Sequence, residues 1–470
     1  MTSAPRQVTD INGVRYSLLR QLGRGGQGAV YEVDGGRLAA KIVFDSSAAR
    51  RERLRNQLTQ VKRLSLADLE IARPIEMLRE PVLGYVMELL TGMQPLKALG
   101  AVPKEESSPA AWYLAGGGLR RRLQLLARSA DALAALHGKG LVYSDPSPHN
   151  IFVSESPAAT EVRFIDADNI HYASVAGVPA VYTPGYGAPE LVRCTSGVNS
   201  LTDAHAFSVL AFQTLSLAHP LIGDAVNDGP PEREEEALGG RLPWIDHPTD
   251  ETNRASYGIP RPNVLSRKLL DLAERAFGAG LRDAAKRPGV SEWAECLHGA
   301  ADATLSCASC KGTYYFTEKL CPWCDEPRPA FATAAFNLWD PSVGAGGDLL
   351  QKPVGDRRRA VVAAVLGLTD GETDTVSPSV TQRLAHGRDG AAGARPVIEL
   401  QLSGTRLSLR SVDGGRYRLS SPSGGRGAEV TDRVKEIRLE PGVASWRLHL
   451  GSPDSLHRVV NFELRPGGAR

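Results

Sequence analysis

The residues best suited to chemistry lie in two short segments, YSDPSPHN and FIDAD. Asp145 is followed five positions later by Asn150, and a short apolar run then leads to Asp166. Carboxylate and amide oxygens on separate loops suit Mg²⁺, which keeps several waters and binds through few protein groups. A further carboxylate can accept or orient the proton of a substrate hydroxyl. The two segments therefore predict phosphoryl transfer, with Asp145 at the substrate hydroxyl and Asn150 and Asp166 at the metal.

A glycine-rich segment, LGRGGQGAVYEV, contains Gly23, Gly25 and Gly28 ahead of Val30. Glycines at this spacing let a hairpin lie close over phosphates, because they have no Cβ to collide. Since the chain has 48 glycines, an ordinary glycine hairpin is the alternative. Lys41 favours the phosphate interpretation, because a lysine inside a strand is costly unless its ammonium meets an anion.

Lys41 needs a carboxylate to hold it, and Glu52 is the only acidic residue between positions 46 and 67. We expect Glu52 to be this partner; the alternative is a surface glutamate on an arginine-rich helix. By its place in the chain, the following strand, YVMELLTG, resembles one that leads into an adenine-binding hinge, so we expect the backbones of Glu88 and Leu90 to meet the edge of an adenine ring. Met87 would line that pocket, although a methionine in a strand is more often plain core.

Four of the six cysteines form two CxxC pairs, CASC and CPWC, separated by ten residues. Four thiolates at this spacing predict a closed, tetrahedral and therefore structural Zn²⁺ site. Paired disulfides are the alternative, but they fit the spacing poorly and suit an oxidising compartment. The expected ligands are Cys307, Cys310, Cys321 and Cys324, and we expect Cys194 and Cys296 to be ordinary buried cysteines.

Composition narrows the class of protein. At 470 residues the chain is too long for one ordinary core, so two or three domains are expected. A net charge of +2 and the lack of a basic stripe argue against a nucleic-acid ligand. No stretch reaches the roughly 18 apolar residues that a membrane span requires, and the N-terminus lacks a signal pattern. We therefore expect a cytoplasmic protein.

Sequence patterns also divide the chain into parts that must position these residues. After an N-terminal tail, the pattern is rich in strands up to about residue 91 and rich in helices thereafter. The cysteine unit follows, and then a segment rich in Gly, Asp and Arg that we expect to be a partly ordered linker. The last part alternates apolar and polar residues, as in a small antiparallel β domain. The expected ranges are 1–15, 16–302, 303–328, 329–395 and 396–470.

The segments LGRGGQGAVYEV, AAKI, MELL, YSDPSPHN, FIDAD, GYGAPE, TDAHAFSVLAF and AKRP occur in protein-kinase order. Over residues 16–300 the chain resembles a bacterial eukaryotic-like serine/threonine kinase. It is similar to the divergent kinases with a zinc ribbon that belong to bacterial stress-response triads. The resemblance implies an α+β, bilobal kinase fold, ATP with Mg²⁺, and a protein substrate. It also implies a PP2C-type phosphatase and a von Willebrand factor A protein as partners.

Further positions match the resemblance. Thr183 in TPGYGAPE would face the substrate and hydrogen-bond Asp145, which favours serine or threonine over tyrosine as the acceptor. We expect Glu190 and Arg287 to form a buried ion pair that anchors the helical lobe. Asp203, at the start of a buried helix, is expected to accept backbone N–H bonds from the catalytic loop.

The chain also departs from the kinase pattern. Tyr143 and Ser144 stand where His-Arg is usual, and Ser147 replaces a lysine that neutralises the transferred phosphate. The last change removes a full charge from a site that works by electrostatics. Ala167 and Asp168 replace the Phe and Gly of the metal loop, and Asp168 adds a carboxylate that could join the metal shell. Our leading hypothesis is an active kinase, and the rival is a pseudokinase scaffold that holds nucleotide without transfer.

Overall fold

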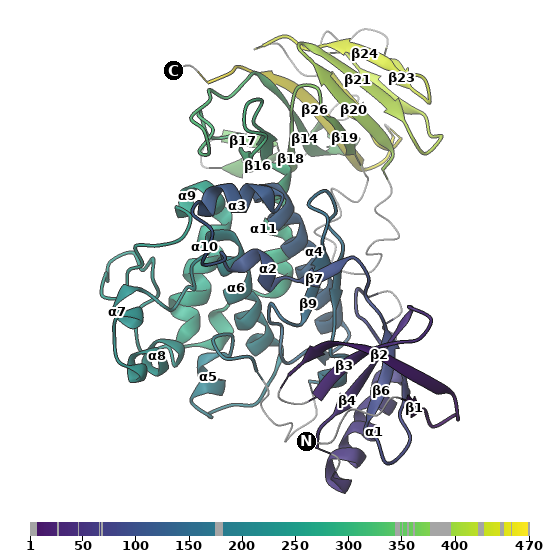
Figure 1. Ribbon diagram of the computed structural model, residues 1–470. Helices are drawn as coiled ribbons and strands as arrows, with labels where there is room; N and C mark the ends of the chain where they lie inside the picture. The colour runs from purple at the N-terminus through teal and green to yellow at the C-terminus, as the bar shows by residue number, and fades with distance from the viewer. Residues whose placement is uncertain are drawn as a thin grey trace. The chain divides into compact units, whose positions relative to one another are not determined.

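The structure is a computed structural model that forms two compact units. The first contains residues 1–104, 128–258 and 271–290, and the second contains residues 105–127, 259–270 and 291–470 (Figure 1). In the described part of the chain, no helix is long and apolar enough to cross a membrane. The structure describes residues 7–25, 28–45, 47–64, 66, 69–173, 182–343, 348–349, 351–354, 357–360, 362–376, 396–421, 427–441, 446–452 and 454–468.

The N-terminal lobe of the first unit is a six-stranded antiparallel sheet with one helix, α1 (Ala48–Arg63). A bridge between Asp10 and Leu78 joins the first strand to the end of the fifth, so the sheet curls back on itself. The first strand lies within the range expected to be an N-terminal tail. In spatial order the strands are β1 (Gln7–Thr9), β2 (Arg15–Arg24), β3 (Gly28–Val33), β4 (Leu38–Val43), β6 (Gly84–Glu88) and β5 (Pro74–Met77).

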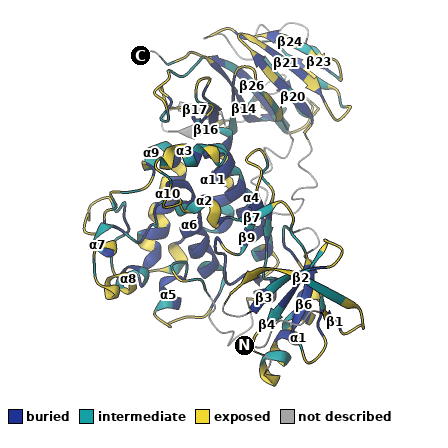
Figure 2. Cartoon of the chain, in the orientation of Figure 1, coloured by how far each residue is buried: buried dark blue, intermediate teal, exposed yellow. Residues whose placement is uncertain are grey.

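The C-terminal lobe is mostly helical, and its centre is α6 (Ser200–Ser216). This helix is buried on nearly every side and along most of its length, as in a helix inside a core, although several of its buried residues are polar (Figure 2). The other helices of this lobe are α2 (Lys97–Gly100), α4 (Gly118–Gly138), α5 (Pro189–Val192), α7 (Asp224–Asn227), α8 (Pro231–Leu238) and α10 (Arg267–Phe277). Short 3₁₀ turns are η2 (Ala279–Leu281) and η3 (Ala284–Lys286).

Short strands between these helices carry the loops of the candidate active site. The strand β9 (Ile151–Ser154) pairs with both β7 (Met93–Pro95) and β10 (Val162–Phe164). The strand β8 (Leu141–Val142) pairs with β11 (His171–Tyr172). Between β10 and β11 the chain forms the 3₁₀ turn η1 (Ala167–Asn169). These pairings place the loop after β8 beside the loop after β10, as the two chemical motifs require.

The second unit contains the cysteine unit, whose hairpin is β12 (Thr304–Ser306) and β13 (Thr313–Tyr315). Around it lie α3 (Pro109–Ala115), α9 (Arg261–Val264), α11 (Val290–Asp302) and the first turns of α4. The rings of Tyr113 in α3 and Trp323 stack with centroids 5.4 Å apart. The Tyr315 hydroxyl donates to the Val264 carbonyl at 2.9 Å. The cysteine unit is therefore packed against helical segments that precede it in the chain.

The rest of the second unit is a β-sandwich, in which a four-stranded and a larger sheet share one apolar core. Its strand β14 pairs along its whole length with the last strand, β26 (Figure 1). β14 lies within residues 329–395, the range that was expected to be a linker. The β domain therefore contains strands from that range as well as strands after residue 395. The strands of these two sheets are β14 (Phe331–Asp340), β15 (Asp348–Leu349), β18 (Val362–Leu368), β19 (Thr373–Val376), β20 (Ile398–Ser403), β21 (Arg406–Ser411), β22 (Tyr417–Ser420), β23 (Ala428–Val430), β24 (Lys435–Arg438), β25 (Trp446–His449) and β26 (His457–Arg465). A separate two-stranded sheet consists of β16 (Gln351–Val354) and β17 (Arg357–Ala360).

Candidate active site

The carboxylate of Asp145 is held by three hydrogen bonds on the loop after β8. Thr183 donates its backbone N–H to Oδ1 at 2.8 Å and its hydroxyl to Oδ2 at 2.9 Å. The amide nitrogen of Asn150 donates to the same Oδ2 at 2.9 Å. Burial raises the pKa of Asp145, while the hydrogen bonds from Thr183 and Asn150 oppose that rise. The expected Thr183–Asp145 hydrogen bond is present, and the carboxylate is fixed in one orientation.

Asp203 stabilises the loop that carries Asp145. It is fully buried at the start of α6 and accepts the backbone N–H groups of Tyr143 at 2.8 Å and Ser144 at 2.9 Å. Its Oδ2 also lies 3.0 Å from Nε2 of His137, the penultimate residue of α4. The expected contact between Asp203 and the catalytic loop is therefore present. Ser144 has a φ of 83°, a conformation that non-glycine residues rarely adopt, so Asp203 helps to hold a strained backbone.

Lys41 and Asp166 form an ion pair, with Nζ and Oδ1 2.9 Å apart. Lys41 is buried in β4, which explains why it requires an anion. Asp166 follows β10 and has a φ of 55°, which turns the chain into η1. Asn150 uses its amide nitrogen on Asp145, so its amide oxygen remains for a metal ion. Asn150 and Asp166 thus offer the oxygen donors that Mg²⁺ prefers.

Glu52 does not take the place expected for it beside Lys41. It is exposed on α1, and an ion pair with Lys41 is not among the contacts of the described residues. The buried face of α1 carries Leu54, Leu58 and Val61. Glu52 precedes Leu54 by two positions, which is about 200° around a helix, so it points away from the lobe. The helical spacing of the apolar residues was the signal in the sequence that could have excluded it.

The glycine-rich hairpin joins β2 to β3, and its glycines differ in their surroundings. A Cβ on Gly23 or Gly25 would meet no atom within 4 Å, whereas one on Gly28 would lie 2.3 Å from the Ile42 carbonyl oxygen. Gly28 is therefore required by the close approach of β4. The open space at Gly23 and Gly25 is compatible with the expected phosphate contact.

The remaining residues expected to contact a nucleotide lie on strands of the N-terminal sheet or just after them. Val30 pairs with Lys41 across β3 and β4, so the two lie side by side. Met87 is part of the apolar core of the lobe, in agreement with the plain-core alternative. Glu88 ends β6 and is exposed, and Leu90 is half-buried two positions later. The positions of Glu88 and Leu90 leave the expected adenine contact as a prediction.

Glu190 and Arg287 form the ion pair expected in the helical lobe. Two guanidinium nitrogens of Arg287 meet the two carboxylate oxygens at 2.6 and 2.7 Å. The Arg287 side chain is only 1% exposed. Burial alone would raise the pKa of Glu190, but the hydrogen bonds and charge of Arg287 outweigh it and hold that pKa below its ordinary value.

Comparison with known proteins gives the same interpretation as this geometry. Residues 16–295, more than half of the chain, match the model of the protein kinase domain. The chain belongs to the protein kinase family. Serine/threonine-protein kinase Pkn1 of Myxococcus xanthus is 33% identical over 220 residues, which are 43% of this chain and 29% of that protein.

Two further bacterial relatives match the kinase domain. The DNA damage-responsive serine/threonine-protein kinase RqkA of Deinococcus radiodurans is 28% identical over 222 residues, 45% of this chain and 31% of that protein. Serine/threonine-protein kinase PknA of Mycobacterium tuberculosis is 28% identical over 233 residues, 47% of this chain and 51% of that protein. The chain thus spans at most about half the length of these curated relatives.

The unusual residues of this kinase's loops have contacts of their own. The Tyr143 hydroxyl donates to the carbonyl of Ile165, directly before Asp166, and so links the loop after β8 to the loop after β10. The Ser144 hydroxyl donates to the Asn169 carbonyl at 3.1 Å. Ser147 is fully buried, and its hydroxyl has no hydrogen-bond partner. The side chain of Asp168 lies outside the described residues.

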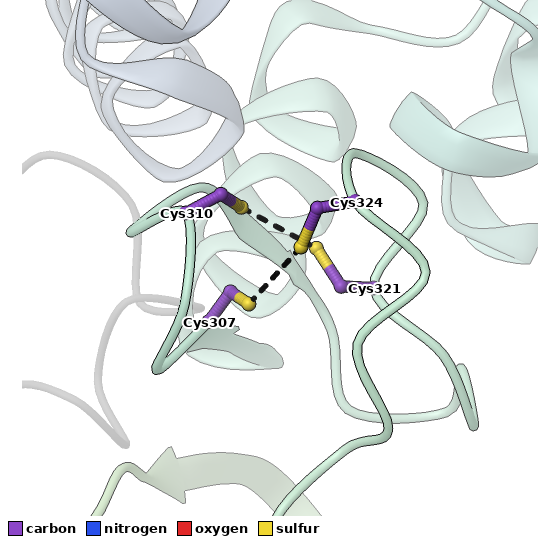
Figure 3. Close-up of side chains that lie close together, drawn as sticks. All are labelled: Cys307, Cys310, Cys321 and Cys324. Carbon is purple, nitrogen blue, oxygen red and sulfur yellow. Dashed lines mark hydrogen bonds between the residues drawn. The ribbon is translucent and has the colours of Figure 1, made fainter. Parts of the chain in front are cut away.

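The four cysteines of the CxxC pairs converge at one point in the second unit of this kinase (Figure 3). All four sulfur atoms lie within 4.8 Å of one another. Sγ of Cys307 is 3.6 Å from that of Cys324, and Sγ of Cys310 is 3.7 Å from that of Cys321. A tetrahedron with Zn–S bonds of about 2.3 Å has edges of about 3.8 Å, so the four sulfurs fit zinc. Because all four positions are thiolates, a bound zinc ion would be structural.

The two other cysteines differ from expectation. Cys194 is exposed and Cys296 is half-buried, so neither is fully buried. Cys194 follows α5 with a φ of 56°, and its backbone N–H donates to the Leu191 carbonyl at 3.0 Å. Its position at the end of a helix, outside the apolar core, explains the exposure.

Proposed function

We propose that this chain is an ATP- and Mg²⁺-dependent serine/threonine protein kinase. The observation that carries the proposal is the set of hydrogen bonds that fixes the Asp145 carboxylate between Thr183 and Asn150. A carboxylate held in this way can orient the hydroxyl of a serine or threonine and accept its proton. The rise in its pKa through burial makes it a better proton acceptor than an ordinary surface aspartate.

Each of the other site residues has a role in this proposal. Lys41 would leave Asp166 to bind ATP phosphates, and Asn150 and Asp166 would hold Mg²⁺. When bound, Mg²⁺ neutralises negative charge on the transferred phosphate. Gly23 and Gly25 leave room for the phosphates beneath the hairpin. The backbone at Glu88 and Leu90 would hold the adenine ring.

The test is transfer of label from ATP. The purified protein is incubated with γ-labelled ATP and Mg²⁺, with an Asp145→Asn variant as the matched control. We expect label on the wild type, or on added Ser/Thr peptides, and at least about a hundredfold less with the variant, because the base and positioning group is lost. Equal labelling by wild type and variant would exclude the assigned role of Asp145.

A pseudokinase scaffold is the second candidate, and Ser147 is the observation that favours it. Its buried hydroxyl supplies no charge at the position where a lysine is expected. A scaffold would gain thermal stability from ATP and Mg²⁺ but transfer no label to any peptide. Stabilisation by nucleotide with no transfer across a degenerate Ser/Thr peptide library would therefore support the scaffold over the enzyme.

The cysteine unit and its family resemblance extend the proposal to partners. We propose that the chain acts in bacterial stress signalling with a von Willebrand factor A protein and a PP2C-type phosphatase. Label transferred to the first protein and removed by the second would support this proposal. Transfer to generic peptides but to neither protein would contradict the partners and leave the kinase assignment standing.

A further inference from the structure

The catalytic loop has no cation of its own at the position where one is expected. Ser147 is fully buried, and its backbone N–H donates to the Asp145 carbonyl at 2.9 Å in a tight turn. Ser147 thus offers only a buried, uncharged hydroxyl at this position. Any positive charge that meets a substrate beside Asp145 must come from another element.

The first residue of α2, Lys97, lies directly against this loop. Its backbone N–H donates to the Pro148 carbonyl at 3.0 Å, and the preceding Leu96 N–H donates to the Ile151 carbonyl at 2.8 Å. These two hydrogen bonds fix the start of α2 on both sides of the segment that contains His149 and Asn150. Whereas Leu96 is fully buried, Lys97 and His149 are exposed. The exposed residues beside the catalytic loop thus include a lysine from α2 and a histidine from the loop itself.

His149 is influenced by the charges of both Lys97 and Asp145. The pKa of His149 is lowered, first by partial burial and then by the positive charge of Lys97, while the negative charge of Asp145 opposes the shift. Both charges therefore act on the same imidazole ring. Lys97 is the exposed ammonium beside the catalytic loop. An ion pair with Lys97 is not among the contacts of the described residues.

We propose that Lys97 makes this kinase select serine or threonine residues with an acidic residue close by in the substrate chain. The inference rests on the proposed kinase function and assigns the substrate class of the same site. An acidic side chain close to the acceptor in the substrate chain would meet the exposed ammonium of Lys97. A basic substrate would be repelled by the same charge.

The experiment compares degenerate Ser/Thr peptide libraries that carry a fixed Asp/Glu or a fixed Lys/Arg at each position near the acceptor. The enzymes are wild type, Lys97→Ala, Lys97→Arg and Lys97→Glu. The control is Lys268→Ala, which removes the same charge from an exposed position on α10. Autophosphorylation with ATP and Mg²⁺ measures basal activity separately from peptide selection.

We expect wild type and Lys97→Arg to prefer acidic peptides, mainly through a lower KM. In Lys97→Ala, the ratio of the rates on acidic and basic peptides should fall about three- to fivefold, as is typical when an exposed charge pair is lost. In Lys97→Glu, the preference should be reversed. The preference should also weaken at high salt, whereas Lys268→Ala should match wild type. Autophosphorylation with an unchanged preference in Lys97→Glu would overturn this inference alone. Absence of all transfer by wild type would overturn the kinase proposal, and the inference with it.

Discussion

The ammonium nitrogen of Lys41 lies 2.9 Å from Oδ1 of Asp166, so two groups expected at a nucleotide neutralise each other. Lys41 is the cation suited to phosphates, and Asp166 is an anion suited to Mg²⁺. Since a strand lysine without an anion would be costly, this ion pair stabilises the site before any nucleotide binds. When ATP and Mg²⁺ bind, the Lys41–Asp166 ion pair would be replaced by two contacts, one between Lys41 and phosphate and one between Asp166 and Mg²⁺.

The Lys41–Asp166 pair predicts different results for Asp166 and for Glu52, which is the carboxylate closer to Lys41 in the sequence. Asp166→Asn should lower phosphate transfer by roughly a hundredfold or more, because it removes charge that acts on the reacting phosphate. Glu52→Gln should keep the rate within about twofold, because Glu52 is exposed on the outer face of α1. Initial rates of autophosphorylation measure both. A large loss in Glu52→Gln would mean that α1 turns inward in the active enzyme.

The Glu190–Arg287 pair predicts a large and asymmetric effect on stability. Arg287→Met should lower the free energy of unfolding by about 3–5 kcal/mol, because it leaves the half-buried carboxylate of Glu190 unpaired. Adding Glu190→Gln should recover part of the loss. The matched control is Lys286→Met, whose ammonium is 3.9 Å from Asp283 and largely exposed, and which should have little effect. Urea unfolding of the four proteins measures these differences; equal losses for Arg287→Met and Lys286→Met would contradict the prediction.

The four-cysteine cluster predicts one zinc ion per chain. Cys310→Ser should lower the zinc content and the midpoint of thermal unfolding, because Cys307 and Cys321 form an apolar cluster with Tyr314 around the metal position. Cys194→Ser is the control, since Cys194 is exposed and outside the cluster. Zinc in freshly purified protein is measured by atomic spectroscopy. A content far below one per chain in the wild type would refute the site.

Buried histidines predict that stability falls with decreasing pH. Burial lowers the pKa of fully buried His205 well below its ordinary value and lowers that of His219 to about 4. In the unfolded chain both have a pKa near 6.5, so below about pH 6.5 the unfolded state binds protons that the folded state does not. Each should therefore lower the free energy of unfolding by at most about 1.4 kcal/mol per pH unit between pH 6.5 and 5.

His205→Leu tests this prediction, because neither ring nitrogen of His205 has a hydrogen-bond partner that the variant would lose. Its ring packs edge-on against Phe277, an apolar contact that leucine can keep in part. Unfolding in urea at several pH values should show a shallower loss on the acid side than in the wild type. An identical pH dependence in the two proteins would mean that other groups govern acid stability.

Some of this protein can be predicted from sequence because the features are local. The two CxxC pairs lie in one short segment, so their spacing nearly dictates a tetrahedral cluster. Asp145 and Asn150 are on one loop, and their side chains hydrogen-bond within it. Gly28 was predicted to matter for phosphates, but the structure gives it a packing reason, the nearby Ile42 carbonyl. That reason depends on which strand lies beside it.

Features that depend on contacts between distant segments could be found only from the tertiary structure. Lys41 pairs with Asp166, 125 positions later, rather than with nearby Glu52, because the direction of a helical side chain is set by which face is buried. Likewise β14 becomes a strand of the β domain by pairing with β26, far along the chain. The kinase motifs and the cysteine cluster could be found from the sequence alone, since these rest on short-range spacing. Folding decided the partner of Lys41, the burial of Ser147 and the position of Lys97, since each depends on packing that no local pattern encodes.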